Sequence, residues 1–152
     1  MRHLVHALKY ERAFHVLRDI AALVRANTYF AGFLAGAVLV PVPLHPRKQR
    51  ERGFNQAELI ANCLVQTVGA AGVEMRLKRV VDTATQTRLN RQSRQENLKN
   101  AFALATTDLL KTSSRYVLVD DVFTTGATLN ACARALRRSG LTRIDVATLG
   151  HG

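Results

Sequence analysis

Apolar residues recur at helical spacing in three parts of the chain. The period of three to four runs from Tyr10 to Ala26, from Gly53 to Gly69, and from about Thr128 to Arg138. Such a period places the apolar side chains on one face of a helix. Gly69 and Gly140 follow the second and third segments, where a glycine commonly ends a helix. The pattern therefore predicts three amphipathic helices.

Short apolar or β-branched runs are interspersed with these helices, and they are typical of buried strands. They read "AVLVPVPL" (37–44), "LKRVV" (77–81), "AFAL" (101–104), "RYVLVDDV" (115–122) and "RIDVATLG" (143–150). Pro43 and Pro46 end the first run, and we expect a loop there because prolines remove backbone donors. Alternation of strands with helices predicts a mostly parallel sheet covered by helices on both faces. We predict one α/β domain over residues 1–152, a suitable length for a single core.

A long polar stretch interrupts the alternation between Asp82 and Asn100. It is rich in Gln, Arg, Asn and Thr and has no sustained apolar period. A loop of this length inside a small domain is commonly a lid or a binding loop, although it could also be a plain connection.

The balance of charge and the cysteines narrow the class of protein. With 22 Lys and Arg against 11 Asp and Glu, the net charge is +11, which favours polyanionic partners such as phosphates or nucleic acid. No apolar run approaches the roughly 20 residues of a membrane span, so we expect no membrane insertion. The first residues lack a signal-peptide core, and a cytoplasmic location is the default. We expect Cys63 and Cys132 to be buried free thiols on helices.

The stretch "VLVDDVFTTGAT" (117–128) is the strongest candidate for chemistry. Asp120 and Asp121 end an apolar strand, where ligands bind in parallel sheets. Because adjacent strand residues point to opposite faces, the two carboxylates could hold different hydroxyls of a polyol, or one ligand and one structural partner. The turn that follows opens a helix, and its backbone N–H groups, threonine hydroxyls and Gly126 suit an anion.

These features together predict a site for a ribose 5-phosphate. The simpler alternative is that Asp121 or Thr125 caps the helix and that Gly126 relieves the turn. That alternative leaves the second acidic residue and the other threonines unexplained. The sequence lacks the P-loop and dinucleotide-binding glycine patterns.

The same stretch resembles the 5-phosphoribosyl-1-pyrophosphate (PRPP) motif of type I phosphoribosyltransferases. The resemblance implies that fold, with a mostly parallel sheet flanked by helices and a long flexible active-site loop. It also implies that the acidic pair holds the ribose hydroxyls and that the following turn wraps the 5-phosphate. The implied PRPP-binding residues are Asp120, Asp121, Thr124, Thr125, Gly126, Ala127 and Thr128.

Two further stretches resemble the ComF family of competence-associated bacterial proteins. They are "VPVPLHPRKQRERGFNQAELIA" (40–61) and "TATQTRLNRQSRQENLKNAF" (83–102), and "ALKY" (7–10) adds to the likeness. The first contains the implied pyrophosphate loop, with Leu44, His45, Arg47 and Arg52. The second matches the flexible catalytic loop, with Thr83, Gln86, Thr87, Arg94 and Asn97. The family's N-terminal zinc-binding cysteine cluster is missing, so we expect no zinc in this chain.

The resemblance implies a PRPP-binding protein that transfers a phosphoribosyl group, releases pyrophosphate and is linked to DNA uptake. Mg²⁺ would be held through PRPP, with Asp120 and Asp121 as candidate protein ligands. The alternative is a non-catalytic module that senses PRPP or binds single-stranded DNA. The partners to test are PRPP, single-stranded DNA, the competence machinery and a second copy of the chain in a homodimer.

Overall fold

The main sheet is parallel and has the strand order β2-β1-β5-β6. The computed structural model describes residues 2–81, 100–106 and 114–151. The strands are β1 (Val38–Pro41), β2 (Gly72–Val73), β5 (Tyr116–Phe123) and β6 (Ile144–His151). Val38 lies opposite Tyr116 and Pro41 opposite Val119. The last residues of β5, from Asp120 onward, therefore extend past the carboxyl end of β1, and among the described strands they pair with β6 alone.

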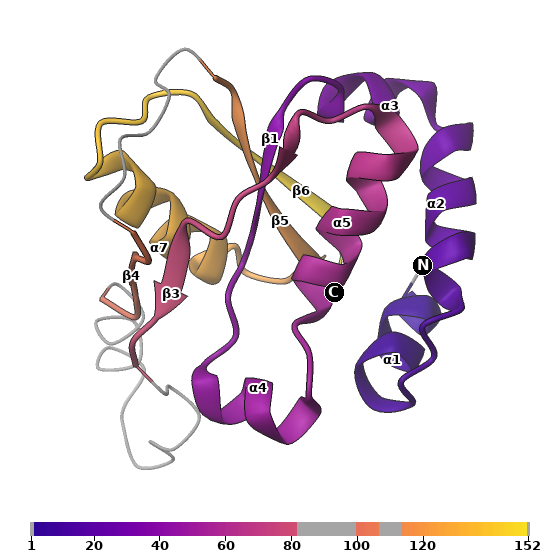
Figure 1. The fold of residues 1–152 in the computed structure, drawn as a ribbon, viewed down its shortest axis with the longest axis horizontal. Coiled ribbons are helices and arrows are strands. Elements are labelled where there is room, and N and C mark those ends of the chain that lie inside the picture. Colours follow the sequence, from indigo (N-terminus) through magenta and orange to yellow (C-terminus); the bar gives the residue numbers. More distant parts are fainter. Residues whose placement is uncertain (1, 82–99, 107–113, 152) are drawn as a thin grey trace.

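Helices cover both faces of this sheet (Figure 1). One face carries α1 (Arg2–Tyr10), α2 (Val16–Ala26), α3 (Thr28–Leu34) and α5 (Gln56–Val68). The other face carries α7 (Ala127–Arg137) and a hairpin of β3 (Leu77–Arg79) and β4 (Phe102–Leu104). The short helix α4 (Pro46–Arg52) stands beyond the carboxyl end of β1, at the bottom of the view in Figure 1.

Two hydrophobic cores follow from the alternation of side chains along β1 and β5. Tyr116 and Leu118 pack in the core under α7, whereas Val117 and Val119 pack in the core under α2 and α5. All four are at most 1% exposed. A strand buried on both faces gains apolar burial from every residue, which explains the continuous apolar run in the sequence.

The prediction of one helix from Tyr10 to Ala26 is wrong at its start. Helix α1 ends at Tyr10 and α2 begins at Val16, because the chain turns at Arg12, whose φ of 53° is left-handed. Phe14 lies in this turn and packs edge-on against Phe54, with 5.2 Å between the ring centroids. Its apolar character thus serves a tertiary contact rather than a helical stripe.

The loop expected after Pro43 is also wrong in part, because α4 begins at Pro46. A proline suits the first position of a helix, and Nδ1 of the preceding His45 accepts a hydrogen bond from the N–H of Arg47 at 3.3 Å. The other two helices are confirmed as α5 and α7. Asn55 caps α5 by accepting from the N–H of Ala57 at 3.1 Å.

The remaining strand predictions are confirmed with one correction of topology. β3 and β4 pair antiparallel in a sheet of their own rather than joining the parallel one. Both cysteines are free thiols; Cys132 is buried and Cys63 is partly buried. No helix in the described part of the chain has the length and apolar character needed to cross a bilayer. The polar stretch from Asp82 to Lys99 lies outside the described residues.

Candidate functional site

The acidic pair lies at the carboxyl edge of the sheet, as predicted, and its two side chains lie on opposite faces. Asp121 follows the register of Val117 and Val119, toward α1 and α5, while Asp120 follows that of Tyr116 and Leu118, toward α7. The pair therefore faces two different environments.

Asp121 is buried against the N-terminal helix. Its side chain is 6% exposed, and its Oδ2 lies 2.6 Å from Nζ of Lys9, the penultimate residue of α1. Among the described residues no hydrogen bond to Oδ2 is formed, so its contact with Lys9 is an ion pair, defined by the short distance and the opposite charges. Of the two arrangements left open by the sequence, this one favours a structural partner for Asp121. Lys9 was not among the predicted site residues.

Asp120 lies on the α7 face in a site that disfavours its charge. Burial, and after it the negative charge of Asp121, raises the pKa of Asp120 from its ordinary 3.8 to about 6. The N–H of Asp121 donates to Asp120 Oδ1 at 2.9 Å, and this bond, with the charges of Lys9 and Arg79, opposes the rise in pKa. A half-buried carboxylate with a perturbed pKa at a strand end is a frequent mark of a functional site.

The turn after β5 forms a small hollow against Asp120. The hollow measures about 30 Å³. Its lining residues are Asp120, Val122, Phe123, Thr124, Gly126, Thr128 and Leu129. Gly126 precedes the first turn of α7 with φ 71°, and Thr125 Oγ1 accepts from the N–H of Ala127 at 3.4 Å. The N–H groups at the start of a helix and the helix dipole make this hollow suitable for an anion.

The predicted pyrophosphate residues lie on α4 or on the connection before it, without forming one cluster. Leu44 and His45 lie on the connection from β1 to α4, and Arg47 Nε donates to Glu51 Oε1 at 2.9 Å on the exposed side of the helix. Arg52 instead points toward α1, where its guanidinium lies 5.7 Å from the centre of the Tyr10 ring. The predicted loop residues Thr83, Gln86, Thr87, Arg94 and Asn97 lie outside the described part of the chain.

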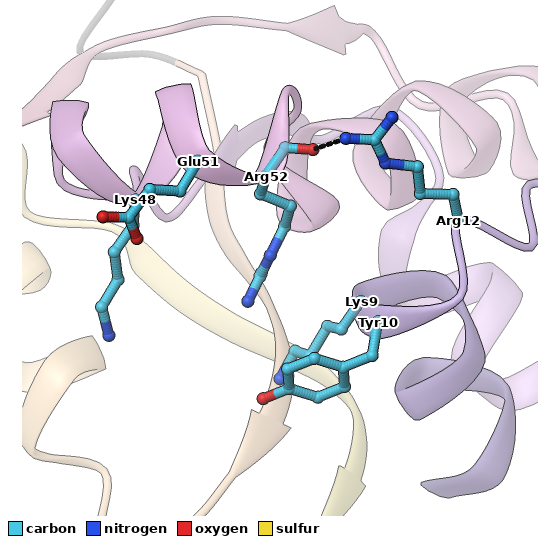
Figure 2. A pocket seen from close by; sticks show the side chains of 6 residues that line it. All are labelled: Lys9, Tyr10, Arg12, Lys48, Glu51 and Arg52. Atoms are coloured by element: carbon cyan, nitrogen blue, oxygen red, sulfur yellow. Dashed lines mark hydrogen bonds between the residues drawn. The ribbon is translucent and has the colours of Figure 1, made fainter.

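A second, larger cavity of about 470 Å³ opens between α1 and α4 (Figure 2), and we call it the α1–α4 pocket. It is lined by Lys9, Tyr10, Arg12, Lys48, Glu51 and Arg52. The three residues from the end of α1 and the following turn were not predicted as site residues. Only the likeness of "ALKY" to ComF proteins pointed to this segment.

A family model described as "Phosphoribosyl transferase domain" matches residues 51–151. The chain therefore belongs to the phosphoribosyltransferase domain family. A hypoxanthine phosphoribosyltransferase from Staphylococcus aureus superposes with a TM-score of 0.52 at 11% identity, covering 91% of this chain and 64% of that one. At this identity the likeness concerns the fold alone, and it confirms the predicted fold class.

The resemblance to the ComF family is confirmed by similar proteins. Competence protein F of Haemophilus influenzae is 36% identical over 147 residues, covering 94% of this chain and 64% of the relative. DNA utilization protein YhgH of Escherichia coli K12 is 34% identical, covering 94% and 63%. Competence protein ComFC of Bacillus subtilis is 32% identical over 103 residues, covering 68% and 39%. The chain thus spans less than two thirds of the length of these relatives.

The turn depends on Gly126 having no side chain. A Cβ there would lie 3.0 Å from Cε2 and 3.1 Å from Cζ of Phe123, in a backbone with φ 71°. We expect Gly126→Ala to lower the free energy of unfolding by about 1–3 kcal/mol. The matched control is Gly32→Ala on α3. A Cβ there would meet none of the described residues within 4 Å beyond its own turn of helix, and a gain of about 0.5–1 kcal/mol is expected. Urea denaturation measures both, and equal effects would contradict this account of the turn.

The raised pKa of Asp120 predicts a pH-dependent cost to stability. Because the pKa in the folded protein exceeds that of the unfolded chain, stability is lost as pH rises from about 4 to about 6. Asn keeps an oxygen for the N–H of Asp121 but carries no charge. We expect Asp120→Asn to stabilise the protein by ~1–3 kcal/mol at pH 8, with the gain vanishing near pH 4.

Thermal denaturation at both pH values measures this difference between Asp120→Asn and the parent protein. The control is Asp145→Asn, a 44% exposed carboxylate at the amino end of β6, for which we expect little change. If Asp120→Asn were less stable than the parent protein at pH 8, the conclusion that burial disfavours the charge of Asp120 would be contradicted.

The Lys9–Asp121 ion pair predicts strong coupling between α1 and β5. Lys9→Met and Asp121→Asn each leave the partner's charge in a partly desolvated place, so each should destabilise the protein by about 1–3 kcal/mol. The double variant should cost less than the sum of the two, by about 1 kcal/mol or more. A double-mutant cycle by denaturation tests this, and simple additivity would show that the pair contributes nothing.

Proposed function

We propose that this protein binds PRPP and transfers its phosphoribosyl group with release of pyrophosphate. The observation that carries the proposal is the shared hollow of Asp120, Thr124, Gly126 and Thr128 at the start of α7. It combines a hydrogen-bond acceptor for sugar hydroxyls with helix-start donors for a phosphate, in the order that a ribose 5-phosphate needs. Membership of the phosphoribosyltransferase domain family supports the same reading.

In this proposal the two aspartates have different roles. The Asp120 carboxylate accepts hydrogen bonds from the ribose hydroxyls. These hydrogen bonds also stabilise the charged form of the carboxylate, which burial disfavours. Asp121 fixes the end of β5 against Lys9 and so positions its neighbour. The turn from Thr124 to Thr128 holds the 5-phosphate with its backbone N–H groups and hydroxyls.

The leaving pyrophosphate carries a large negative charge, and its stabilisation should supply most of the rate. Asp120 suits Mg²⁺ chemically, because it presents carboxylate oxygens at the strand end beside the candidate phosphate site. Mg²⁺ bound with PRPP would neutralise the pyrophosphate as it leaves. Arg52, His45 and the backbone at Leu44 are the proposed pyrophosphate contacts of the chain itself.

The proposed link to DNA rests on the names of similar proteins and on the net charge of this chain. Proteins similar to this chain are called competence and DNA utilization proteins, and the net charge of +11 would attract a polyanion. We therefore keep single-stranded DNA and competence components as proposed partners. A non-catalytic PRPP sensor that binds single-stranded DNA is the second candidate. A cytoplasmic location and a homodimer stay predictions.

Calorimetric titration of PRPP with Mg²⁺ tests the proposal, with pyrophosphate release followed in the same samples. We expect the parent to bind and Asp120→Asn to bind about tenfold or more weakly, because hydrogen bonds to a charged acceptor are lost. Asp145→Asn, which removes a carboxylate at the opposite edge of the sheet, is the matched control.

The outcomes separate the candidates. Binding with pyrophosphate release that depends on Asp120 would support an enzyme. Binding without release, together with salt-dependent binding of single-stranded DNA, would support the sensor. Equal binding of PRPP by the parent and Asp120→Asn would overturn the role of Asp120.

A further inference from the structure

The α1–α4 pocket has an excess of positive charge in its lining. Of the six described residues that line it, four are cations and one, Glu51, is acidic. Lys9 is paired with Asp121, and Glu51 is paired with Arg47 outside the pocket. Within the described residues, Arg12, Lys48 and Arg52 have no carboxylate within 4.0 Å. Three cations around one cavity, none of them paired with a carboxylate of the described residues, favour an anionic ligand.

The lining of the pocket is held in place by contacts between segments far apart in sequence. Arg12 Nη2 donates to the carbonyl oxygen of Arg52 at 3.4 Å, which ties the turn after α1 to the end of α4. Figure 2 shows Arg52 extending from α4 toward Tyr10 and Lys9 at the end of α1. Arg12 itself adopts φ 53°, a rare conformation for a residue with a side chain. Such backbone strain is frequent at ligand sites.

The pocket is separate from the hollow proposed for the ribose 5-phosphate. Among the residues that the structure describes, the two cavities have no lining residue in common, and the hollow lies on the α7 face whereas the pocket lies on the α1 side. They are nevertheless close, because Lys9 lines the pocket and contacts Asp121, the neighbour of Asp120. A volume of about 470 Å³ is in the range of small-molecule sites.

We propose that the α1–α4 pocket binds the second substrate of the transfer, and that this acceptor is an anion carrying a carboxylate or a phosphate. This inference rests on the proposed function. A lone pair of the acceptor forms the new bond to the anomeric carbon of PRPP as the bond from that carbon to pyrophosphate breaks. Pyrophosphate leaves with the electron pair, and the proton of the acceptor passes to solvent. Lys48 and Arg12 select the anionic acceptor, whereas Arg52 lies where it can contact the pyrophosphate that leaves.

Matched pairs of probes test the charge of the acceptor. Orotate differs from uracil, and nicotinate from nicotinamide, chiefly in a carboxylate. Each would be titrated calorimetrically into the intact protein, with and without PRPP and Mg²⁺. We expect the carboxylate of at least one pair to bind about tenfold tighter than its neutral partner. Equal binding within both pairs, or no binding of either carboxylate, would overturn the proposal.

Variants on one helix locate the binding. Lys48→Gln removes a pocket cation, and Arg50→Gln removes an exposed cation of the same helix that does not line the pocket. We expect Lys48→Gln to reduce the carboxylate preference about fivefold or more while PRPP binding is retained, and Arg50→Gln to leave both unchanged.

Pyrophosphate with Mg²⁺ is titrated as a further ligand, because it is the other anion that could occupy the pocket. If Lys48→Gln weakens pyrophosphate and the carboxylate probe equally, the pocket belongs to the leaving group and the acceptor proposal fails. If the parent fails to bind PRPP, the proposed function fails instead. The titrations without PRPP still report whether the pocket selects carboxylates.

Discussion

The alternation of side chains along β5 is the constraint on which the rest of the site depends. A strand buried on both faces must send successive residues to opposite sides, and the register that buries Leu118 and Val119 also separates Asp120 from Asp121. A shift by one residue would exchange the two cores and both aspartates at once. The hydrophobic packing of the strand thus fixes which carboxylate faces the turn of α7 and which faces α1.

This division makes the N-terminal helix part of the candidate site. Lys9 neutralises the side chain of Asp121, which is 6% exposed. The same end of α1 supplies Tyr10 to the α1–α4 pocket. Lys9 and Tyr10 lie before the segment 51–151 that matches the family model. The segment matched by the family model therefore contains β5, the turn after it and Arg52. The residues before that segment supply Lys9, Tyr10, Arg12 and Lys48 to the α1–α4 pocket. The proposed acceptor site is therefore built partly by residues that lie outside the segment matched by the family model.

The sequence predicted those features that depend on local chemistry. The apolar runs identified β1, β5 and β6, the helical period identified α5 and α7, and the order of acidic pair, threonines and glycine located the strand–turn–helix unit. It missed the features set by tertiary contacts. Nothing local distinguishes Lys9 from other surface lysines, and the break at Arg12 is hidden because Ala13 and Phe14 continue the apolar period. His45 and Pro46 did hold a helix-start signal for α4, which the expectation of a loop overlooked.

The most direct test of the central claim is a crystal structure with PRPP and Mg²⁺ bound. The account predicts the ribose hydroxyls within hydrogen-bond distance of Asp120, the 5-phosphate against the N–H groups from Gly126 to Thr128, and Asp121 still paired with Lys9. A ribose held by Asp121, with Lys9 displaced and Asp120 away from the ligand, would contradict the division of roles between the two aspartates.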